Sequence, residues 1–246
     1  MKSLLISDLH SNREALSRIL EFVAKKGVSR MICLGDIVGY GAEPDHVIEQ
    51  LRRSRRKKMI IRGNHDRVAI GETEGDDFNE VAREAIYWTR ERLSRSSLRF
   101  LEDLPKGPIE EASDFLICHG SPDDEDEYVL SEFQAARILN DWPQRLIFFG
   151  HTHLPCLYRL GEERVQLMWI EEPMTIHLEP DRRYMINPGS VGQPRDYDWR
   201  TSFAIWDDER DTVQFFRLEY DVASTQHSIR GAGLPSILAD RLGSGF

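Results

Sequence analysis

The stretch Met59-Ile60-Ile61-Arg62-Gly63-Asn64-His65-Asp66 carries the pattern from which the rest of the chain can be interpreted. Its apolar first half predicts a buried strand, and its polar second half follows the carboxyl end of that strand. Open α/β sheets bind ligands at this end of their strands, in the loops that follow. One such cluster alone is equally compatible with a turn that holds a hydrogen-bonded histidine. Its recurrence along the chain favours a functional site.

The same change from an apolar run to a polar motif occurs four more times. Predicted strands at 3–7, 31–34, 115–118 and 146–149 lead into Asp8-Leu9-His10, Gly35-Asp36, His119-Gly120 and Gly150-His151-Thr152-His153. Between the first strands, apolar residues 16, 19, 20 and 23 form one helical stripe, with Ser11 or Asn12 as its cap. Pro44 opens a second helix to about Arg53. Alternating strands and helices predict an α/β fold with parallel strands and right-handed crossovers.

The remaining sequence predicts helices first and then more strands. Residues 76–104 have a helical pattern that ends at Pro105, and a further helix is expected at 131–140. Beyond Pro155, short alternating segments predict a second sheet with more antiparallel character. From about Asp221 the chain is expected to form a tail of amphipathic helices. Without repeats or linkers, residues 1–246 are interpreted as a single domain.

Composition limits the classes of function. The formal net charge of −10 argues against a general nucleic-acid binder, which needs a basic face. No apolar stretch approaches the roughly 20 residues that span a bilayer, so no membrane association is expected. The segment before Asp8 is too short for a signal peptide, which predicts a cytoplasmic protein. Three cysteines without CxxC spacing predict buried thiols rather than a disulfide framework.

The polar residues that follow the predicted strands form a set of nitrogen and oxygen ligands. They include five of the eight histidines, and they are Asp8, His10, Asp36, Asn64, His65, His119, His151 and His153. A set without thiolates suits Mn, Fe, Zn or Ni better than a structural zinc or calcium site. It is too large for one ion, and a carboxylate can bridge two, as in two-metal phosphatases and nucleases. In an extended chain, alternate residues of Asp8-x-His10 and His151-x-His153 would project the same way.

In their order, these five motifs resemble the signature blocks of the calcineurin-like metallophosphoesterases. Gly39-Tyr40-Gly41 and the stretch from Asn187 to Arg195 are similar to the small prokaryotic phosphodiesterase-type branch. The resemblance spans residues 8–195, about three-quarters of the chain. It implies a four-layer α/β/β/α sandwich of two packed mixed sheets, with the metals at the strand ends.

The resemblance also implies a role for each site residue. One divalent ion would be held by Asp8, His10, Asp36 and His153, and a second by Asp36 as the bridge with Asn64, His119 and His151. The pair of ions would activate a bridging hydroxide that attacks phosphorus. His65 would be the catalytic residue without metal contact, because a protonated imidazole can stabilise the phosphoryl charge or donate to the leaving oxygen.

The chain departs from the family in its second block. Protein phosphatases of the superfamily typically have Gly-Asp-x-x-Asp-Arg-Gly there, whereas this chain has Gly35-Asp36-Ile37-Val38-Gly39-Tyr40-Gly41. The missing arginine argues against a protein phosphatase. Arg195 either replaces it as a substrate-binding cation or forms a surface salt bridge. Tyr40 either lines the mouth of the site or packs on its turn. Asp66 either orients His65 or caps a helix.

These features predict an enzyme that hydrolyses a small phosphoester or nucleotide. A phosphodiesterase is favoured over a phosphomonoesterase, and the acidic run 123–127, if it overhangs the site, would disfavour long polyanions. Tyr197 and Trp199 are the aromatics expected to stack on a base. The alternative is a non-catalytic scaffold on the same fold, like the retromer subunit of this superfamily. The oligomeric state stays open, and a homo-oligomer is compatible with the sequence.

Overall fold

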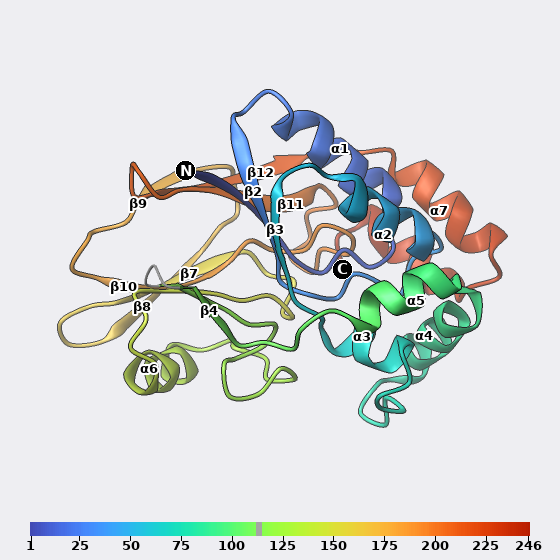
Figure 1. Cartoon of the computed structure of the whole chain (residues 1–246), viewed down its shortest axis with the longest axis horizontal. Helices are drawn as coiled ribbons and strands as arrows, with labels where there is room; N and C mark the ends of the chain where they lie inside the picture. Colours follow the sequence, from blue (N-terminus) through green and yellow to red (C-terminus); the bar gives the residue numbers. More distant parts are fainter. Residues whose placement is uncertain (112–114) are drawn as a thin grey trace.

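Two six-stranded sheets form the centre of the protein (Figure 1), a computed structural model that describes residues 1–111 and 115–246. The first sheet has the order β3 (Lys57–Ile60), β2 (Val28–Cys33), β1 (Lys2–Ile6), β11 (Thr201–Asp207), β12 (Thr212–Leu218) and β9 (Thr175–His177). The second has the order β4 (Ile109–Glu111), β5 (Phe115–Ile117), β6 (Leu146–Phe148), β10 (Arg183–Asn187), β7 (Cys156–Leu160) and β8 (Val165–Trp169).

Both sheets are mixed. Strands β1, β2 and β3 are parallel, as the alternating pattern predicted, and β5, β6 and β10 are parallel in the other sheet. The prediction that the strands beyond Pro155 form a separate sheet was wrong. Three of them, β9, β11 and β12, extend the first sheet in antiparallel fashion, and β7, β8 and β10 complete the second. Strand pairing over long sequence distances is not visible in a local pattern.

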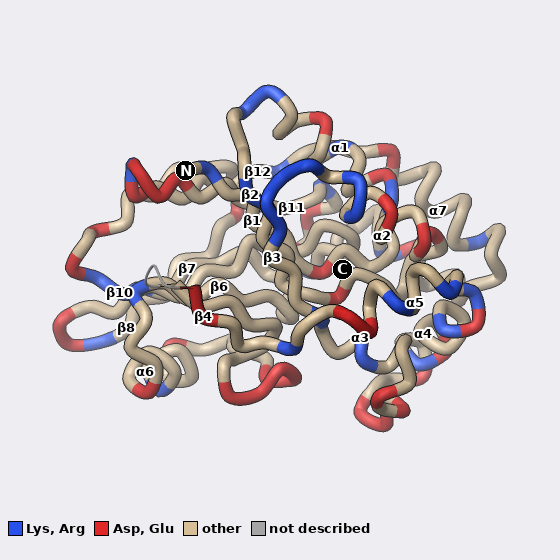
Figure 2. The backbone as a smooth tube through the Cα atoms, viewed as in Figure 1, with Lys and Arg blue, Asp and Glu red and all other residues tan. Residues whose placement is uncertain are grey.

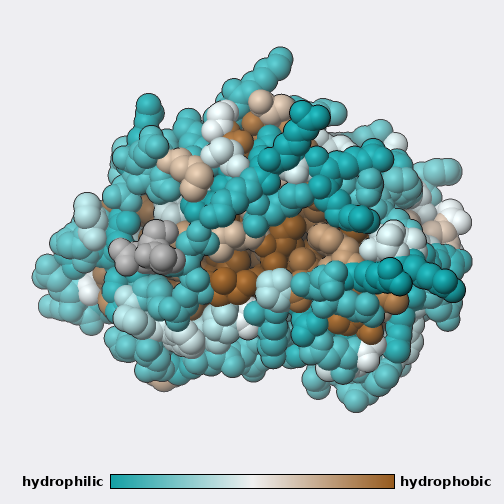
Figure 3. All heavy atoms as spheres, viewed as in Figure 1, coloured by the Kyte–Doolittle hydropathy of each residue, from teal (hydrophilic) through white to brown (hydrophobic). Residues whose placement is uncertain are grey.

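The sheets pack face to face between layers of helices, which confirms the four-layer α/β/β/α sandwich. Side chains from both sheets, such as Leu5, Ile32, Phe115 and Phe148, form the cluster between them. Helices α1 (Arg13–Val23) and α2 (Pro44–Arg53) cover the outer face of the first sheet. Helix α6 (Glu132–Asp141) covers the second sheet. Figure 3 shows a mostly hydrophilic face on which apolar atoms are visible between the two sheet edges.

The predicted helical stretch 76–104 is divided into two helices, so the continuous interpretation was wrong. Helix α4 spans Glu80–Arg92 and α5 spans Arg95–Glu102. The chain becomes extended at Leu93, and the Ser94 side chain accepts a hydrogen bond from the Ser97 amide to begin a new helix. A side-chain cap of this kind favours a helix start over continuation. The short helix α3 (Asn64–Ala69) begins at the motif that follows β3.

The predicted helical tail is present as α7 (Val222–Gly231), α8 (Ser236–Asp240) and a 3-10 turn, η1 (Arg241–Gly243). It packs against α4 and the loop after β2, where buried Ile229, Leu238 and Leu242 share a cluster with Tyr40 and Ala85. The Trp88 indole donates a hydrogen bond to the Ala232 carbonyl at 3.1 Å. The tail therefore lies against the residue expected at the mouth of the site. None of the described helices has the length and apolar character required to cross a membrane.

Candidate metal centre

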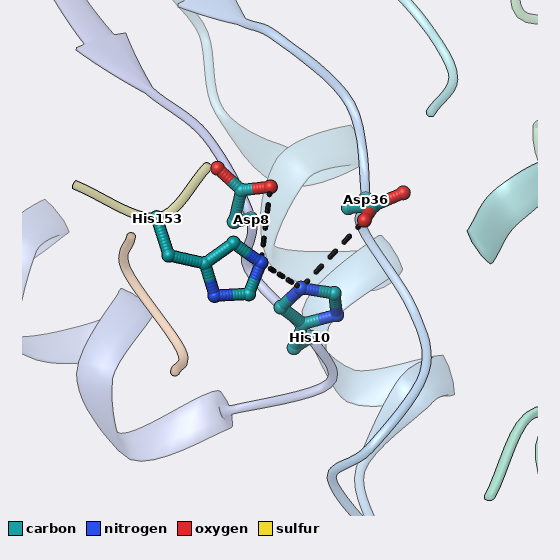
Figure 4. Close-up of side chains that lie close together, drawn as sticks. All are labelled: Asp8, His10, Asp36 and His153. Atoms are coloured by element: carbon teal, nitrogen blue, oxygen red, sulfur yellow. Dashed lines mark hydrogen bonds and ion pairs between the residues drawn. The ribbon is translucent and has the colours of Figure 1, made fainter. Parts of the chain in front are cut away.

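The strand ends of both sheets meet and bring the predicted ligands together. One buried group consists of Asp8, His10, Asp36 and His153 (Figure 4), and a second consists of Asp36, His119 and His151. Within each group the donor atoms lie within 4.8 Å of one another. Asn64 adjoins the second group, because its Oδ1 is 3.0 Å from His119 Nε2. Asp36 belongs to both groups, which is the position that a bridging carboxylate requires.

The backbone at these residues is left-handed. Five of the candidate ligands have positive φ: Asp8 (54°), His10 (46°), Asp36 (51°), His151 (64°) and His153 (63°). The expected extended geometry of the two alternate pairs was therefore wrong, although Asp8 and His10 do converge on the first group, while His151 and His153 belong to different groups. Residues other than glycine rarely adopt this region, and each such conformation costs on the order of 1 kcal/mol or more. Backbone hydrogen bonds between the loops, such as Asp8 N to Gly35 O at 3.1 Å, hold the strained segments in place.

Three imidazoles are oriented by backbone carbonyls. Nδ1 lies 3.2 Å from the Val38 oxygen in His10, 2.7 Å from the Leu34 oxygen in His119, and 2.5 Å from the Gln193 oxygen in His153. A carbonyl only accepts, so Nδ1 carries a proton in each ring, and in the neutral form of the ring Nε2 presents a lone pair. This arrangement is typical of metal-binding histidines.

The donor atoms repel one another unless a cation lies between them. His10 Nε2 and His153 Nε2 are 3.1 Å apart, so two lone pairs face each other (Figure 4). Asp8 Oδ2 is buried without a hydrogen-bond partner in the described part of the chain. Two neutral imidazoles and two carboxylates in this arrangement match the nitrogen and oxygen donor set of a divalent transition metal. The residues therefore fit the metal that the motifs imply.

The pKa values of the candidate ligands also favour a site for cations. Burial lowers the pKa of His10 and of His153 well below the ordinary value, and it lowers the pKa of His151 to about 3. In His119, burial also acts against protonation, but the Asp36 carboxylate outweighs it and raises the pKa to about 10. Burial raises the pKa of Asp8 to about 7. Cations entering the site would displace the protons that these two groups hold.

The second group adjoins the acidic loop. His151 Nε2 lies 3.1 Å from the Asp126 carbonyl, which leaves Nδ1 as the available nitrogen of this ring. The Tyr128 ring packs on the same imidazole, with 4.0 Å between ring centroids. Glu125 is buried between Arg67 and Lys106, so it is not a solvated surface acid. Of the acidic run, Asp126 is the residue that lines the pocket at the candidate site.

His65 lies beside the two groups without belonging to either. Its backbone amide donates to Asp36 Oδ1 at 2.9 Å, and its ring packs between those of Tyr40 and Phe78 at 4.5 and 4.4 Å. Nδ1 is buried without a partner among the described residues. Burial lowers the pKa of this histidine to about 4. The ring is neutral before a substrate binds, and Nε2 is the nitrogen left for an adjacent pocket.

That pocket has a volume of about 350 Å³, and His65, Asn64 and His151 form part of its wall. Phe78 and Tyr128 line it, although neither was singled out in the sequence. Four acidic residues line the same pocket: Glu74, Asp76, Asp77 and Asp126. They lie on two loops, one after α3 and one between β5 and α6, and Figure 2 shows acidic stretches on both loops. The polar motifs of the sequence predict the two groups of candidate metal ligands, but the residues of the pocket wall belong to no motif.

The weaker sequence expectations have mixed outcomes. Tyr40 lines the pocket, and its hydroxyl accepts a hydrogen bond from Arg195 Nη2 at 3.4 Å. Asp66 has the contacts of a cap, because its carboxylate accepts from the amides of Gly63, Ile37 and Val38 at about 3 Å. In the described residues no hydrogen bond joins Asp66 to His65.

Tyr197 and Trp199, which were expected to stack on a base, are not part of the pocket wall. Tyr197 stacks on Phe246, and Trp199 packs near Tyr220.

Comparison with known proteins agrees with this geometry. Residues 1–211 match the family described as the calcineurin-like phosphoesterase superfamily domain. The chain belongs to this superfamily. A metallophosphoesterase structure from Sphaerobacter thermophilus has 38% identity and a TM-score of 0.88, and the similarity covers 100% of this chain and 99% of that one. An uncharacterized protein of Methanocaldococcus jannaschii is 36% identical over 242 residues, which are 96% of this chain and 95% of its own length.

Other members of the superfamily are similar over shorter segments. Phosphodiesterase YfcE of Escherichia coli is 32% identical over 74 residues, which are 27% of this chain and 40% of that protein. These findings confirm the family and the fold expected from the motifs. Metal binding and the role of each residue stay predictions. The helices α7 and α8 and the turn η1 lie beyond the residues that match the calcineurin-like domain.

Proposed function

We propose that this calcineurin-like protein is a dinuclear metal-dependent phosphoric ester hydrolase, and specifically a phosphodiesterase that acts on a small phosphoester or nucleotide. The observation that carries the proposal is the pair of His10 and His153 Nε2 atoms 3.1 Å apart, beside an Asp36 that both donor groups share. When bound, two divalent ions would activate water and neutralise phosphoryl charge. Mn, Fe, Zn and Ni all suit the donor set.

The residues around the metal groups would orient the substrate. His65 faces the pocket next to both groups, so its Nε2–H can donate to a phosphoryl oxygen in the neutral form. The negative charge of a bound phosphoryl group favours the protonated imidazole, which can then give its proton to the leaving oxygen. Arg195, hydrogen-bonded to Tyr40, would supply a cation for the phosphoryl oxygens.

The pocket supports a small diester substrate. Its volume of about 350 Å³ offers room for the second alcohol group of a diester beside the phosphoryl site. Phe78 and Tyr128 provide apolar surface for that group. The four carboxylates that reach the pocket would repel a long polyanion, so nucleic acid is not the proposed substrate.

The proposal is tested with chelator-stripped protein, bis-p-nitrophenyl phosphate and p-nitrophenyl phosphate, before and after addition of Mn²⁺. Metal-restored hydrolysis with a preference for the diester is expected. His65→Ala should keep two ions per chain and slow turnover roughly a hundredfold or more, because an acid or hydrogen-bond donor at the phosphoryl group is lost. The exposed His177 on β9 offers a matched control, and His177→Ala should turn over like the unsubstituted protein.

Two outcomes would contradict the proposal. Unchanged turnover in His65→Ala would exclude the role of this histidine in the reaction. A protein that binds no metal and hydrolyses neither ester would favour the alternative, a non-catalytic scaffold on the calcineurin-like fold.

A further inference from the structure

The segment beyond the calcineurin-like domain brings a second arginine to the mouth of the site. Arg241 opens the turn η1, which α7 and α8 hold against Tyr40 and α4 through buried apolar contacts. Its guanidinium lies over the Tyr40 ring, with 4.6 Å from the guanidinium carbon to the ring centroid. The other neighbours of that ring are His10 and His65, at 4.6 and 4.5 Å. Arg241, a candidate metal ligand and the candidate catalytic residue therefore all contact the same aromatic ring.

The Arg241 side chain lacks the partners that a buried guanidinium requires. Its Nε and Nη2 atoms are buried, and neither has a hydrogen-bond partner within residues 1–111 and 115–246. Over the same residues it forms no ion pair, whereas Arg230 on α7 is paired with Asp240 at 2.7 Å. A buried donor left unsatisfied costs about 1–3 kcal/mol, and more when it is charged. This cost is offset if a ligand supplies the acceptor.

Arg195 meets Arg241 at the same tyrosine. Its Nη2 donates to the Tyr40 hydroxyl at 3.4 Å, and it too forms no ion pair with the described residues. Burial lowers the pKa of Arg241, and the positive charge of Arg195 is one further reason that it is lowered. Two neighbouring, partly buried guanidinium groups that form no ion pair with the described residues are electrostatically unfavourable. In a chain of net charge −10, such a pair indicates a binding site for an anion.

The tail also fixes the loop that carries Arg195. The Tyr197 amide donates to the Gly245 carbonyl at 2.8 Å, and the Tyr197 ring stacks on Phe246 with 5.7 Å between centroids. On the other side of Arg195, Gly192 N donates to Asp8 O at 2.9 Å. The loop is therefore tied to the metal groups at one end and to the tail at the other. These contacts hold both guanidinium groups at Tyr40, which lines the pocket.

We infer that Arg241 is a substrate-binding residue, which together with Arg195 binds the phosphoryl oxygens of the substrate at the Tyr40 side of the metal centre. The inference rests on the proposed phosphoesterase function and adds a residue from outside the domain that defines the superfamily. The ligand class is a tetrahedral oxyanion, either the phosphoryl group of the ester or the phosphate released from a monoester. A dianionic monoester gains more from the second cation than a monoanionic diester does.

The test compares Arg241→Ala and Arg241→Lys with Arg230→Ala as a matched surface arginine. Binding of inorganic phosphate is measured by titration calorimetry on the Mn²⁺-loaded protein, and kcat and KM are measured for p-nitrophenyl phosphate and bis-p-nitrophenyl phosphate. Arg241→Ala should weaken phosphate binding roughly tenfold or more and raise KM more than it lowers kcat. The loss should be larger for the monoester, and Arg241→Lys should recover part of it because the charge is kept. Arg230→Ala should behave like the unsubstituted protein.

The outcomes separate this inference from the proposed function. Phosphate binding and KM that stay unchanged in Arg241→Ala would overturn the role of Arg241. Equal losses for both esters, with a lower Tm and fewer bound ions, would also overturn it, because a merely structural contact with Tyr40 explains that result. An unsubstituted protein that hydrolyses neither ester would contradict the proposed function, while the phosphate titration would still decide whether Arg241 binds the anion.

Discussion

Substitution of Gly63 by alanine would probe the metal centre without changing the charge of any ligand. Gly63 directly precedes Asn64, and its φ of −108° is a conformation that alanine adopts freely. A Cβ atom there would lie 2.3 Å from Asp36 Oδ1 and 2.7 Å from His119 Cε1. It would also lie 2.6 Å from the Asp36 backbone nitrogen, so the effect is steric and acts on the residue that both ligand groups share.

The size of the effect follows from these distances. Ordinary van der Waals contact of a Cβ begins at 3.4 Å, so Asp36 Oδ1 would have to retreat by about 1.1 Å from its position at 2.3 Å. Overpacking of this kind costs about 1–3 kcal/mol. If the carboxylate moves out of the position that a metal requires, the same free energy is lost from metal binding. We expect each ion to bind roughly 5- to 150-fold more weakly.

The assay measures Mn²⁺ affinity and stoichiometry by titration calorimetry and the Tm of the chelator-stripped protein. Gly231→Ala is the matched control, because a Cβ at this last residue of α7 meets nothing within 4 Å. That substitution should leave metal binding unchanged and raise the stability of the protein by at most about 1 kcal/mol. Two ions bound with unsubstituted affinity in Gly63→Ala would refute the argument that Asp36 bridges the two groups.

Two further predictions concern the same ligands. Asp36→Asn should reduce both metal occupancy and turnover, since it removes a charge from both groups, and metal analysis showing two ions per chain in this variant would argue against bridging. Metal affinity should fall as the pH is lowered through about 7, because burial raises the pKa of Asp8 to about 7 and a protonated carboxyl must lose its proton before it binds an ion. Below that pH the proton competes with the metal, and for one titrating group the apparent affinity for Mn²⁺ falls about tenfold per pH unit. Equal affinities in Mn²⁺ titrations at pH 6 and pH 8 would contradict this prediction.

The sequence predicted the fold well where neighbouring elements determine it. Apolar runs followed by Asp, Gly or His located β1, β2, β3, β5 and β6 to within three residues at each end. The pattern could not assign the later strands to a sheet, because β11 pairs with β1 across some two hundred residues. It also missed the break at Leu93, where a serine cap ends a periodicity that continues in the sequence. Local patterns therefore predicted the elements better than their long-range pairing.

The candidate ligands could be predicted because chemistry restricts which side chains bind metals, whereas the wall of the pocket follows no such rule. Phe78 and Tyr128 resemble any other partly buried aromatic residues in the sequence, and only the fold places them beside His65 and His151. Arg241 lies 46 residues beyond Arg195 in a tail without a motif, and its approach to Tyr40 depends on the packing of α7 and α8. The residues that determine substrate specificity are therefore harder to predict from a sequence than the class of reaction.

The strain at the metal centre and its protonation have one common explanation. Left-handed backbone at residues such as Asp8 and His153, facing Nε2 lone pairs, and protons held by Asp8 and His119 are each unfavourable alone. A well-packed sequence would relieve them by substitution unless a ligand compensated for them. Divalent ions would compensate for all three, because they would attract the lone pairs, replace the protons and bind only when the strained loops hold the donors in place. The two partly buried guanidinium groups at Tyr40 follow the same logic with opposite charge, because a bound anion would stabilise them. A centre for cations beside a site for an anion would be the arrangement that phosphoryl transfer to water needs.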